Sequence, residues 1–325
     1  MNGLVEQTPL AGIALGVQFK GVTYVQGYGL AGLESREPVT TQTVFKIASL
    51  TKAATAAGIL KLSDEGKLSL DDPISRFLPQ APSIAQGILV RHLLNHTSGL
   101  PDWSIDTAQE ALPETFTTEQ AVDYYFSTVE KLDSEPGHVW SYSNAGYFLL
   151  GAILENLSGM AYDEYFKTAF FQPLALNSLD ECPSQPDLLA TGYHSIDGGF
   201  EVANPSNLKL LAAAGGLCSN IEDVLQWQVA LTHGETIHAK IWDQISTPGT
   251  LSDGQALDYG FGVSVQMMDQ GLAMMHDGTT AGFNSFFIYY PEHDLNVVLL
   301  TNTDGFDSHL RAFSSLIVSK LLRLQ

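Results

Sequence analysis

Short apolar runs of strand length lie at both ends of the chain, whereas the middle has the spacing of helices. Near the N-terminus, residues 13–19 and 22–28 read as two strands joined by a tight turn at Lys20-Gly21. Near the C-terminus, four more runs have the length and apolar character of successive antiparallel strands: 260–265, 272–275, 284–290 and 295–300. The pattern predicts one sheet assembled from both ends of the chain.

Helical spacing fills most of the remaining length. An alanine-rich segment from Ser49 to about Asp64 predicts a helix that stops at Gly66. Ser219 and Glu222 form a capping-box pattern at the start of another helix. Further helices are expected at 90–95, 119–128, 144–157, 162–171 and 308–324.

These elements predict an α+β fold in which an antiparallel sheet is flanked by helices. We expect a discontinuous α/β sheet domain formed by residues 1–64 and 206–325. A mostly helical domain, residues 65–205, would be inserted between them. The boundary between the two is where a ligand cleft is expected.

Charge narrows the classes of partner. The chain has 325 residues with 15 Lys and Arg against 36 Asp and Glu, a formal net charge of −21. Such a chain repels the phosphates of nucleic acid and of anionic membrane surfaces, so neither partner is expected. No apolar run reaches the roughly 18 residues of a membrane span. The apolar run from Leu10 to Val17 follows Glu6 instead of a basic region, which disfavours a signal peptide. A cytoplasmic protein, or an exported one whose signal is missing from this chain, is expected.

The chain has two cysteines, Cys182 and Cys218. Two are too few for a disulfide framework or a cysteine-based zinc site. One bridge at most is possible, and two buried thiols are the simpler expectation.

The sharpest chemical signal is Ser49-Leu50-Thr51-Lys52 at the start of the alanine-rich helix. Residues i and i+3 share a helix face, so Lys52 would lie beside the Ser49 hydroxyl. A partly buried lysine can lose its proton and act as the base that activates a serine nucleophile. A second Ser-x-x-Lys match, from Ser206 to Lys209, follows Asn204-Pro205 in a loop-like segment, so the first match is favoured.

Two further motifs carry chemistry. In Tyr142-Ser143-Asn144, a tyrosinate beside a lysine ammonium would shuttle protons, and the asparagine amide would orient a substrate carbonyl and contact the lysine. Ser143 or Asn144 could equally cap the following helix, and both readings can hold.

The third motif is His276-Asp277-Gly278-Thr279 at the end of a predicted strand. Gly278 would let a backbone approach a ligand closely, and a following N–H could complete an oxyanion hole with the N–H of Ser49. The alternative is an ordinary Asp-Gly turn.

The three motifs, in this order and spacing, resemble the serine β-lactamase and penicillin-binding-protein superfamily. They are most similar to its class C β-lactamase-like branch, which includes family VIII carboxylesterases and D-aminopeptidases. Supporting segments are similar to stretches that this superfamily uses structurally: residues 27–31, 92–100 and 214–217. The resemblance covers nearly the whole chain.

The resemblance implies a β-lactamase-like fold and an acyl-enzyme mechanism without metal or organic cofactor. Ser49 would be the nucleophile, and Lys52 and Tyr142 would share the work of the general base. Asn144 would contact the substrate or hold Lys52, with His276 and Gly278 on the substrate-binding wall. The backbone N–H groups of Ser49 and Thr279 would form the oxyanion hole. Trp103 would lie in a loop over the cleft and contact an acyl or alcohol group.

One departure bears on the substrate. The superfamily's β-lactamases carry a lysine where this chain has His276, and a histidine is mostly neutral near pH 7. A carboxylic ester with a short or medium acyl chain is therefore the expected substrate. β-Lactams, amides and D-aminoacyl peptides stay open as alternatives on the same residues. A non-hydrolytic penicillin-binding or sensor module is the alternative of another class. The sequence does not predict the oligomeric state.

Two weaker motifs are set aside. Residues 27–32 match the Gly-x-Gly-x-x-Gly of dinucleotide sites, but a turn-like segment with Pro38 follows where a helix is required. His92 and His96 have the spacing of a zinc pair but lack the glutamate of His-Glu-x-x-His. Polar contacts at a helix end are the simpler interpretation.

Overall fold

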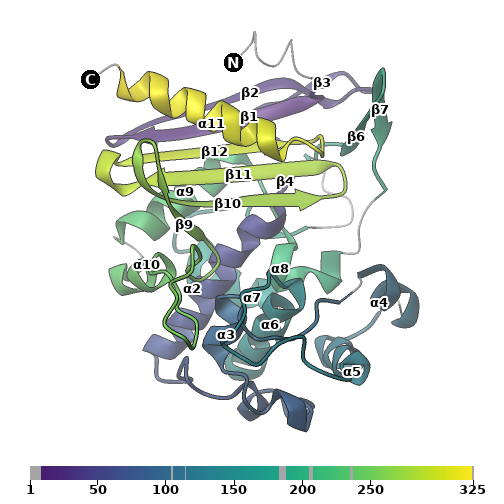
Figure 1. Ribbon diagram of the computed structural model, residues 1–325. Helices are drawn as coiled ribbons and strands as arrows, with labels where there is room; N and C mark the ends of the chain where they lie inside the picture. Colours follow the sequence, from purple (N-terminus) through teal and green to yellow (C-terminus); the bar gives the residue numbers. More distant parts are fainter. Residues whose placement is uncertain are drawn as a thin grey trace.

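The central sheet is built from both ends of the chain (Figure 1). The structure is a computed structural model that describes residues 9–103, 105–113, 115–182, 188–204, 208–234 and 237–323. Seven strands follow the order β3-β2-β1-β12-β11-β10-β9. Their bounds are β1 (Gly12–Phe19), β2 (Val22–Gly32), β3 (Glu37–Pro38), β9 (Ser264–Met268), β10 (Gly271–Thr280), β11 (Phe283–Tyr290) and β12 (Leu295–Thr301).

The pairing in this sheet is antiparallel, as predicted. β1 lies between β2 and β12, and Leu15 of β1 is opposite Leu299 of β12. The strands β1, β11 and β12 are buried almost throughout because both faces of the sheet are covered. This explains why their sequence is nearly continuously apolar instead of alternating.

Helices cover the sheet on both sides (Figure 1). One face packs on α11 (Asp307–Leu322) through Leu310, Phe313 and Val318. The other face meets a larger core that includes α2 (Thr51–Asp64) and α9 (Ile221–His233). Gly16 of β1 leaves room for Ile221, because a side chain there would lie 3.2 Å from it. None of the described helices is long and apolar enough to cross a membrane.

The remaining elements are mainly short. The other α-helices are α3 (Val90–Leu94), α4 (Ile105–Ala111), α5 (Thr118–Thr128), α6 (Asn144–Ser158), α7 (Tyr162–Phe166), α8 (Ala212–Gly215) and α10 (Ala239–Ile245). A three-stranded sheet has the order β4-β8-β5, and a hairpin joins β6 to β7. These strands are β4 (Phe45–Lys46), β5 (Asp180–Glu181), β6 (Tyr193–Ile196), β7 (Gly199–Val202) and β8 (Leu217–Ser219). The division into a sheet domain and a helical domain stays a prediction.

Two local predictions were wrong. The cap of α9 is Asn220, whose side chain accepts the N–H of Asp223 at 2.9 Å. Ser219 ends β8 instead, and its hydroxyl lies 3.0 Å from that of Ser178. In addition, β9 begins at Ser264 and not at residue 260, whereas β10 continues to Thr280 and carries the whole His276 motif inside a strand.

The two cysteines form a disulfide, which corrects the expectation of two buried thiols. Cys182 and Cys218 are bridged with their Cα atoms 4.8 Å apart. Cys218 lies in β8, which pairs with β4 on one side and β5 on the other. The bridge therefore links the segment after β5 to β8. One neighbour of β8 in this sheet is β4, which lies just before Ser49 in the sequence.

Candidate active site

Ser49 lies on a short helical turn. A 3₁₀ turn, η1 (Ala48–Leu50), leads directly into α2. Ala48 and Leu50 are buried, whereas Ser49 between them is partly exposed. Ala48 has a φ of +47°, in the left-handed region that non-glycine residues rarely adopt. Such strain is typical of functional sites. The N–H groups of a first helical turn have no partner within the helix, which leaves the Ser49 N–H available to a ligand.

Strand β10 packs tightly against this turn. A Cβ atom at Gly278 would lie 2.6 Å from the carbonyl oxygen of Ile47, closer than any real contact. The Ser285 hydroxyl, on neighbouring β11, donates to the same carbonyl at 2.7 Å. Gly278 was expected to admit a ligand. Its close approach is instead to the protein's own backbone, which fixes the distance between β10 and Ser49.

Lys52 is fully buried, and its amine has three close oxygen neighbours. Nζ lies 3.1 Å from Ser49 Oγ, 2.8 Å from Asn144 Oδ1 and 2.6 Å from the carbonyl oxygen of Ala214. Burial lowers the pKa of Lys52 to about 7, although the charge of Asp102 acts in the opposite direction. A neutral amine has two N–H donors and one lone pair. The amide and carbonyl oxygens can take the two donors, which leaves the lone pair for the Ser49 hydroxyl.

Tyr142, two residues before the start of α6, contacts Ser49. Its hydroxyl donates to Ser49 Oγ at 2.8 Å. Burial raises the pKa of Tyr142 well above its usual value. The expected tyrosinate beside a lysine ammonium is therefore reversed: the phenol keeps its proton, and Lys52 is the group that becomes neutral near pH 7.

The start of α6 shows both the expected helix cap and the expected contact between Asn144 and Lys52. Ser143 caps the helix by accepting the N–H of Gly146 at 3.1 Å. Asn144, the first residue of the helix, accepts from Lys52.

Sequence reasoning missed Asp102, which holds this turn. Its Oδ1 accepts the N–H of Ala145 at 2.8 Å and the Ser143 hydroxyl at 3.3 Å, so it binds both neighbours of Asn144. A carboxylate at a helix N-terminus is favourable, but the partners are separated by about 40 residues and no local pattern marks them.

His276 ends a chain of hydrogen bonds that sequence reasoning also missed. The N–H of Ser143 donates to His96 Nδ1 at 3.1 Å, so the proton of that neutral ring is on Nε2. His96 Nε2 lies 3.2 Å from the Tyr259 hydroxyl, which lies 3.0 Å from His276 Nε2. His276 Nδ1 lies 2.6 Å from the carbonyl oxygen of Asp277, an acceptor. His96 donates to Tyr259, Tyr259 donates to His276, and His276 donates to the Asp277 carbonyl, so each of these groups has a partner.

Both histidines in this chain of hydrogen bonds are neutral. Burial lowers the pKa of His276 to about 3, and the nearby Lys52 charge acts in the same direction. Burial likewise lowers the pKa of His96 well below its usual value. The wall that faces Ser49 therefore carries no imidazolium at neutral pH.

The side chains around Ser49 line a cleft of about 370 Å³. Asp277 is the charged residue on its wall, and its carboxylate is ion-paired with Arg311 of α11. The pairing of β10 with β9 ends at Met275, so the next residues of β10 form an unpaired edge within the described strands. The lining residues are Ser49, Trp140, Tyr142, Asn144, Tyr259, Ser264, His276, Asp277 and Thr279.

The tryptophan of the cleft is not the predicted one. Trp103 packs inside the helical region, with ring centroids 4.6 Å from Phe148 and 5.7 Å from Tyr125. Trp140, 41% exposed, lines the cleft in its place and lies 5.9 Å from the ring of Tyr259. The two tryptophans are equally plausible in sequence, because only tertiary packing decides which ring reaches the cleft.

The motifs that were set aside have structural roles. Residues 27–32 lie in β2, where no phosphate-binding helix follows. His92 Nδ1 accepts the N–H of Leu89 at the start of α3. Ser206 lies outside the described residues. Within the ranges that the structure describes, no three His, Cys, Asp or Glu side chains converge as metal ligands.

The chain is similar in sequence and fold to known proteins. The Beta-lactamase family model matches residues 1–317. Penicillin-binding protein 4* of Bacillus subtilis is 31% identical over 322 residues, which cover 93% of this chain and 70% of that protein. D-aminopeptidase of Gluconobacter oxydans is 28% identical over 307 residues, but the match covers only 58% of that protein.

A solved structure is similar over its whole length. D-amino acid amidase from Ochrobactrum anthropi, complexed with L-phenylalanine, superposes with a TM-score of 0.83 at 25% identity. The match covers 99% of this chain and 97% of that one.

Proposed function

Because this chain belongs to the Beta-lactamase family and is a serine hydrolase, we propose that it cleaves amides of single amino acids, with the D-enantiomers preferred. The observation that carries the proposal is the charge of the cleft wall. Asp277 is the charged residue among the described residues that line it, and His276 is held neutral. A substrate carboxylate would meet Asp277 on this wall and no unpaired cation, whereas a free amine would share the Asp277 carboxylate with Arg311, its ion-pair partner.

The names of the relatives support the amide and the stereochemistry. A D-aminopeptidase and a D-amino acid amidase are among the proteins similar to this chain. Esters of short acyl chains, which the sequence favours, are the second candidate. They would use the same residues. Their cleavage needs less help from an acid, because an alcohol leaves more readily than an amine.

Acylation begins with Ser49. Its Oγ–H proton passes to the lone pair of Lys52 while Oγ bonds to the substrate carbonyl carbon. The negative charge that develops on the carbonyl oxygen would face the N–H groups of Ser49 and Thr279. The C–N bond then breaks, and the leaving nitrogen takes the phenolic proton of Tyr142. The ammonium of Lys52 returns that proton to Tyr142.

Deacylation repeats these transfers with water. A water molecule that attacks the acyl carbon gives its proton to Lys52, and the bond to Ser49 breaks. The ammonium of Lys52 returns that proton to Ser49 Oγ, and the acid product leaves. Asn144 and the Ala214 carbonyl hold Lys52 through both halves of the cycle.

The test compares substrates that differ in one charge. D-phenylalanine amide, its L-enantiomer and its N-acetyl derivative are offered with p-nitrophenyl butyrate and a chromogenic cephalosporin. We expect the free D-amide to have the highest kcat/KM of the amides, N-acetylation to lower it, and Ser49→Ala to abolish all turnover. Asp277→Asn should narrow the difference between the free and the acetylated amine.

Three other results would refute the proposal. Fastest turnover of the cephalosporin would show that a neutral His276 does not exclude β-lactams. Ester turnover without amide turnover would make the protein a carboxylesterase. A stable acyl-enzyme mass without product would make it a binding or sensor module.

A further inference from the structure

A second cavity lies on the other side of the loops that form the cleft. It has a volume of about 400 Å³ and lies between α3 and the segment that follows α10. Arg91, His92 and Asn95 supply its polar wall. Leu70, Pro248 and Leu251 are among the apolar residues that line it.

The polar wall presents hydrogen-bond donors that have no partner among the described residues. Asn95 is only 5% exposed, and its Oδ1 accepts the Thr97 hydroxyl at 2.7 Å, which leaves the two N–H groups of Nδ2 unused. His92 Nδ1 accepts the N–H of Leu89 at 3.2 Å, so the neutral ring carries its proton on Nε2. Burial lowers the pKa of His92 to about 4, which keeps the ring neutral. Arg91 uses Nη2 for Asp71, at 2.7 Å, and has further donors.

Glycine keeps the Asn95 donors accessible. A Cβ atom at Gly249 would lie 2.9 Å from Asn95 Nδ2. Because a side chain there would cover this nitrogen, the glycine leaves the amide open to the cavity. Asn95 Nδ2 therefore faces the cavity, where a ligand or water can accept from it.

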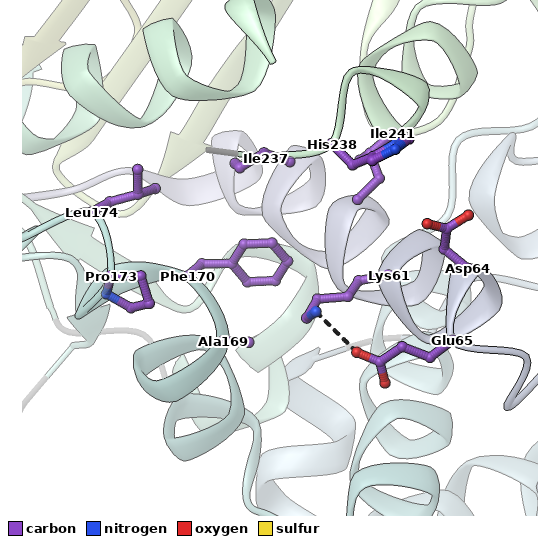
Figure 2. Close-up of a pocket in the computed structure, with 10 residues that line it drawn as sticks. All are labelled: Lys61, Asp64, Glu65, Ala169, Phe170, Pro173, Leu174, Ile237, His238 and Ile241. Atoms are coloured by element: carbon purple, nitrogen blue, oxygen red, sulfur yellow. Dashed lines mark ion pairs between the residues drawn. The ribbon is translucent and has the colours of Figure 1, made fainter. Parts of the chain in front are cut away.

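The charge of this cavity differs from that of the others. No carboxylate is among its described lining residues, although the chain has 36 acidic residues against 15 basic ones. The cleft has Asp277, and the cavity shown in Figure 2 has Asp64 and Glu65. In Figure 2 the cation Lys61 is already paired with Glu65, at 2.9 Å. Asp64 of that cavity is paired with Lys240, at 2.8 Å. In the second cavity Arg91 is paired with Asp71, and the donors that have no partner among the described residues include the N–H groups of Asn95 Nδ2 and His92 Nε2.

We infer that this cavity binds a monocarboxylate with a short apolar chain. The carboxylate has only acceptors, and it would take donors from Asn95, His92 and Arg91. The apolar chain would lie on Leu70, Pro248 and Leu251. The site is independent of the reaction at Ser49.

The cavity and the cleft share two segments of chain. The N–H of Gly249 donates to the carbonyl of Tyr259 at 2.8 Å, and the N–H of Ser252 donates to the carbonyl of Gly137 at 2.8 Å. Gly137, Gly249 and Ser252 line the cavity, whereas Tyr259 and Tyr142 reach into the cleft. The two spaces are thus neighbours separated by one layer of backbone.

Calorimetric titration of the full chain tests the inference with three probes of equal length: hexanoate, hexanamide and hexylamine. We expect hexanoate to bind with 1:1 stoichiometry, hexanamide at least about tenfold more weakly, and hexylamine not at all. The titrations are carried out on Ser49→Ala, which cannot turn over any probe. Repeating the hexanoate titration on wild type that carries a phosphonate on Ser49 should give the same affinity, because the cleft is then filled.

Three variants place the binding. Asn95→Asp keeps the acceptor for Thr97 but replaces the open N–H groups with a negative oxygen, so hexanoate binding should be lost. Arg91→Gln should weaken binding at least about tenfold. Arg76→Gln is the matched control, because Arg76 also pairs with an aspartate but does not line the cavity.

The inference is overturned by absence of hexanoate binding, by equal binding of hexanamide, or by displacement when Ser49 is blocked. Unchanged binding in Arg91→Gln and Asn95→Asp also overturns it. Arg91 is largely at the surface, so its variant remains informative if Asn95→Asp does not fold.

Discussion

The carbonyl oxygen of Ala214 lies 2.6 Å from the amine of Lys52, although the two residues are 162 positions apart. Ala214 belongs to α8, a helix of only four residues. With Asn144 Oδ1, this carbonyl accounts for both donors of a neutral amine. The lone pair of the neutral amine is then left for the Ser49 proton, and burial favours this neutral form.

Activity should rise with pH through about 7. Lys52 must be neutral to act as the base, and burial lowers its pKa to about 7. The profile of kcat/KM against pH should therefore show an acid limb near that value. His276 and His96 cannot produce it, because burial keeps both neutral there. A limb near pH 5 or below would contradict the assignment.

Lys52 should also make the free energy of unfolding depend on pH. An unfolded lysine stays protonated to about pH 10.4, whereas folded Lys52 is neutral above about 7. The unfolded state then binds more protons, so the free energy of unfolding should rise with pH between these values. Lys52→Met should lose this component and lower kcat by about 10²–10⁴-fold. Urea unfolding at several pH values measures the first effect.

Asp102→Asn should move the acid limb to lower pH. The amide oxygen can still accept the N–H of Ala145, so the start of α6 keeps its geometry. The negative charge that raises the pKa of Lys52 is removed. Asp197→Asn, in the exposed turn between β6 and β7, is the matched control and should leave the profile unchanged. An unchanged limb in Asp102→Asn would show that this charge does not reach Lys52.

Tyr142→Phe should lower kcat by about 10²–10⁴-fold with little change in KM. The variant loses the donor to Ser49 Oγ but keeps the ring, whose centroid lies 4.4 Å from that of His96. Steady-state kinetics with amide and ester substrates checks this. The loss should be larger for the amide, because its leaving nitrogen needs a proton. Equal small losses for both would remove Tyr142 from the mechanism.

Gly278→Ala should inactivate the enzyme by displacing the turn that carries Ser49. The new methyl group would meet the Ile47 carbonyl at 2.6 Å, and backbone cannot yield as a flexible side chain can. Gly199→Ala is the control, because a Cβ at Gly199 meets no atom within 4 Å. Near-UV circular dichroism separates local displacement from unfolding. Full activity in Gly278→Ala would show that the turn adapts.

The Cys182–Cys218 bridge should contribute about 4 kcal/mol to the free energy of unfolding, since it closes a loop of 36 residues. Chemical unfolding of Cys182→Ala/Cys218→Ala against wild type measures this. Wild type under strong reductant is the second arm and should match the double variant. No difference between oxidised and reduced protein would contradict the estimate.

The elements that local pattern encodes were predicted well, and so was the proximity of four side chains of the site. The structure brings together Ser49, Lys52, Tyr142 and Asn144. They could be predicted because each lies in a short motif at or next to the start of a helix. Asp102 had no such mark, since its role depends on a turn folding back onto α6. The confusion of Ser219 with Asn220 has the same origin: both are good capping residues, and the pairing of β8 decided between them.

The position of β12 has a consequence for biosynthesis. It lies between β1 and β11, so β1 has β12 and β2 as its two neighbours. Nearly 300 residues separate Ile13 from its partner Thr301. While a ribosome is still translating the middle of the chain, the first hairpin has its inner edge unpaired and apolar. The sheet can close only after β12 has left the exit tunnel, and until then this apolar edge is exposed to pairing with other chains.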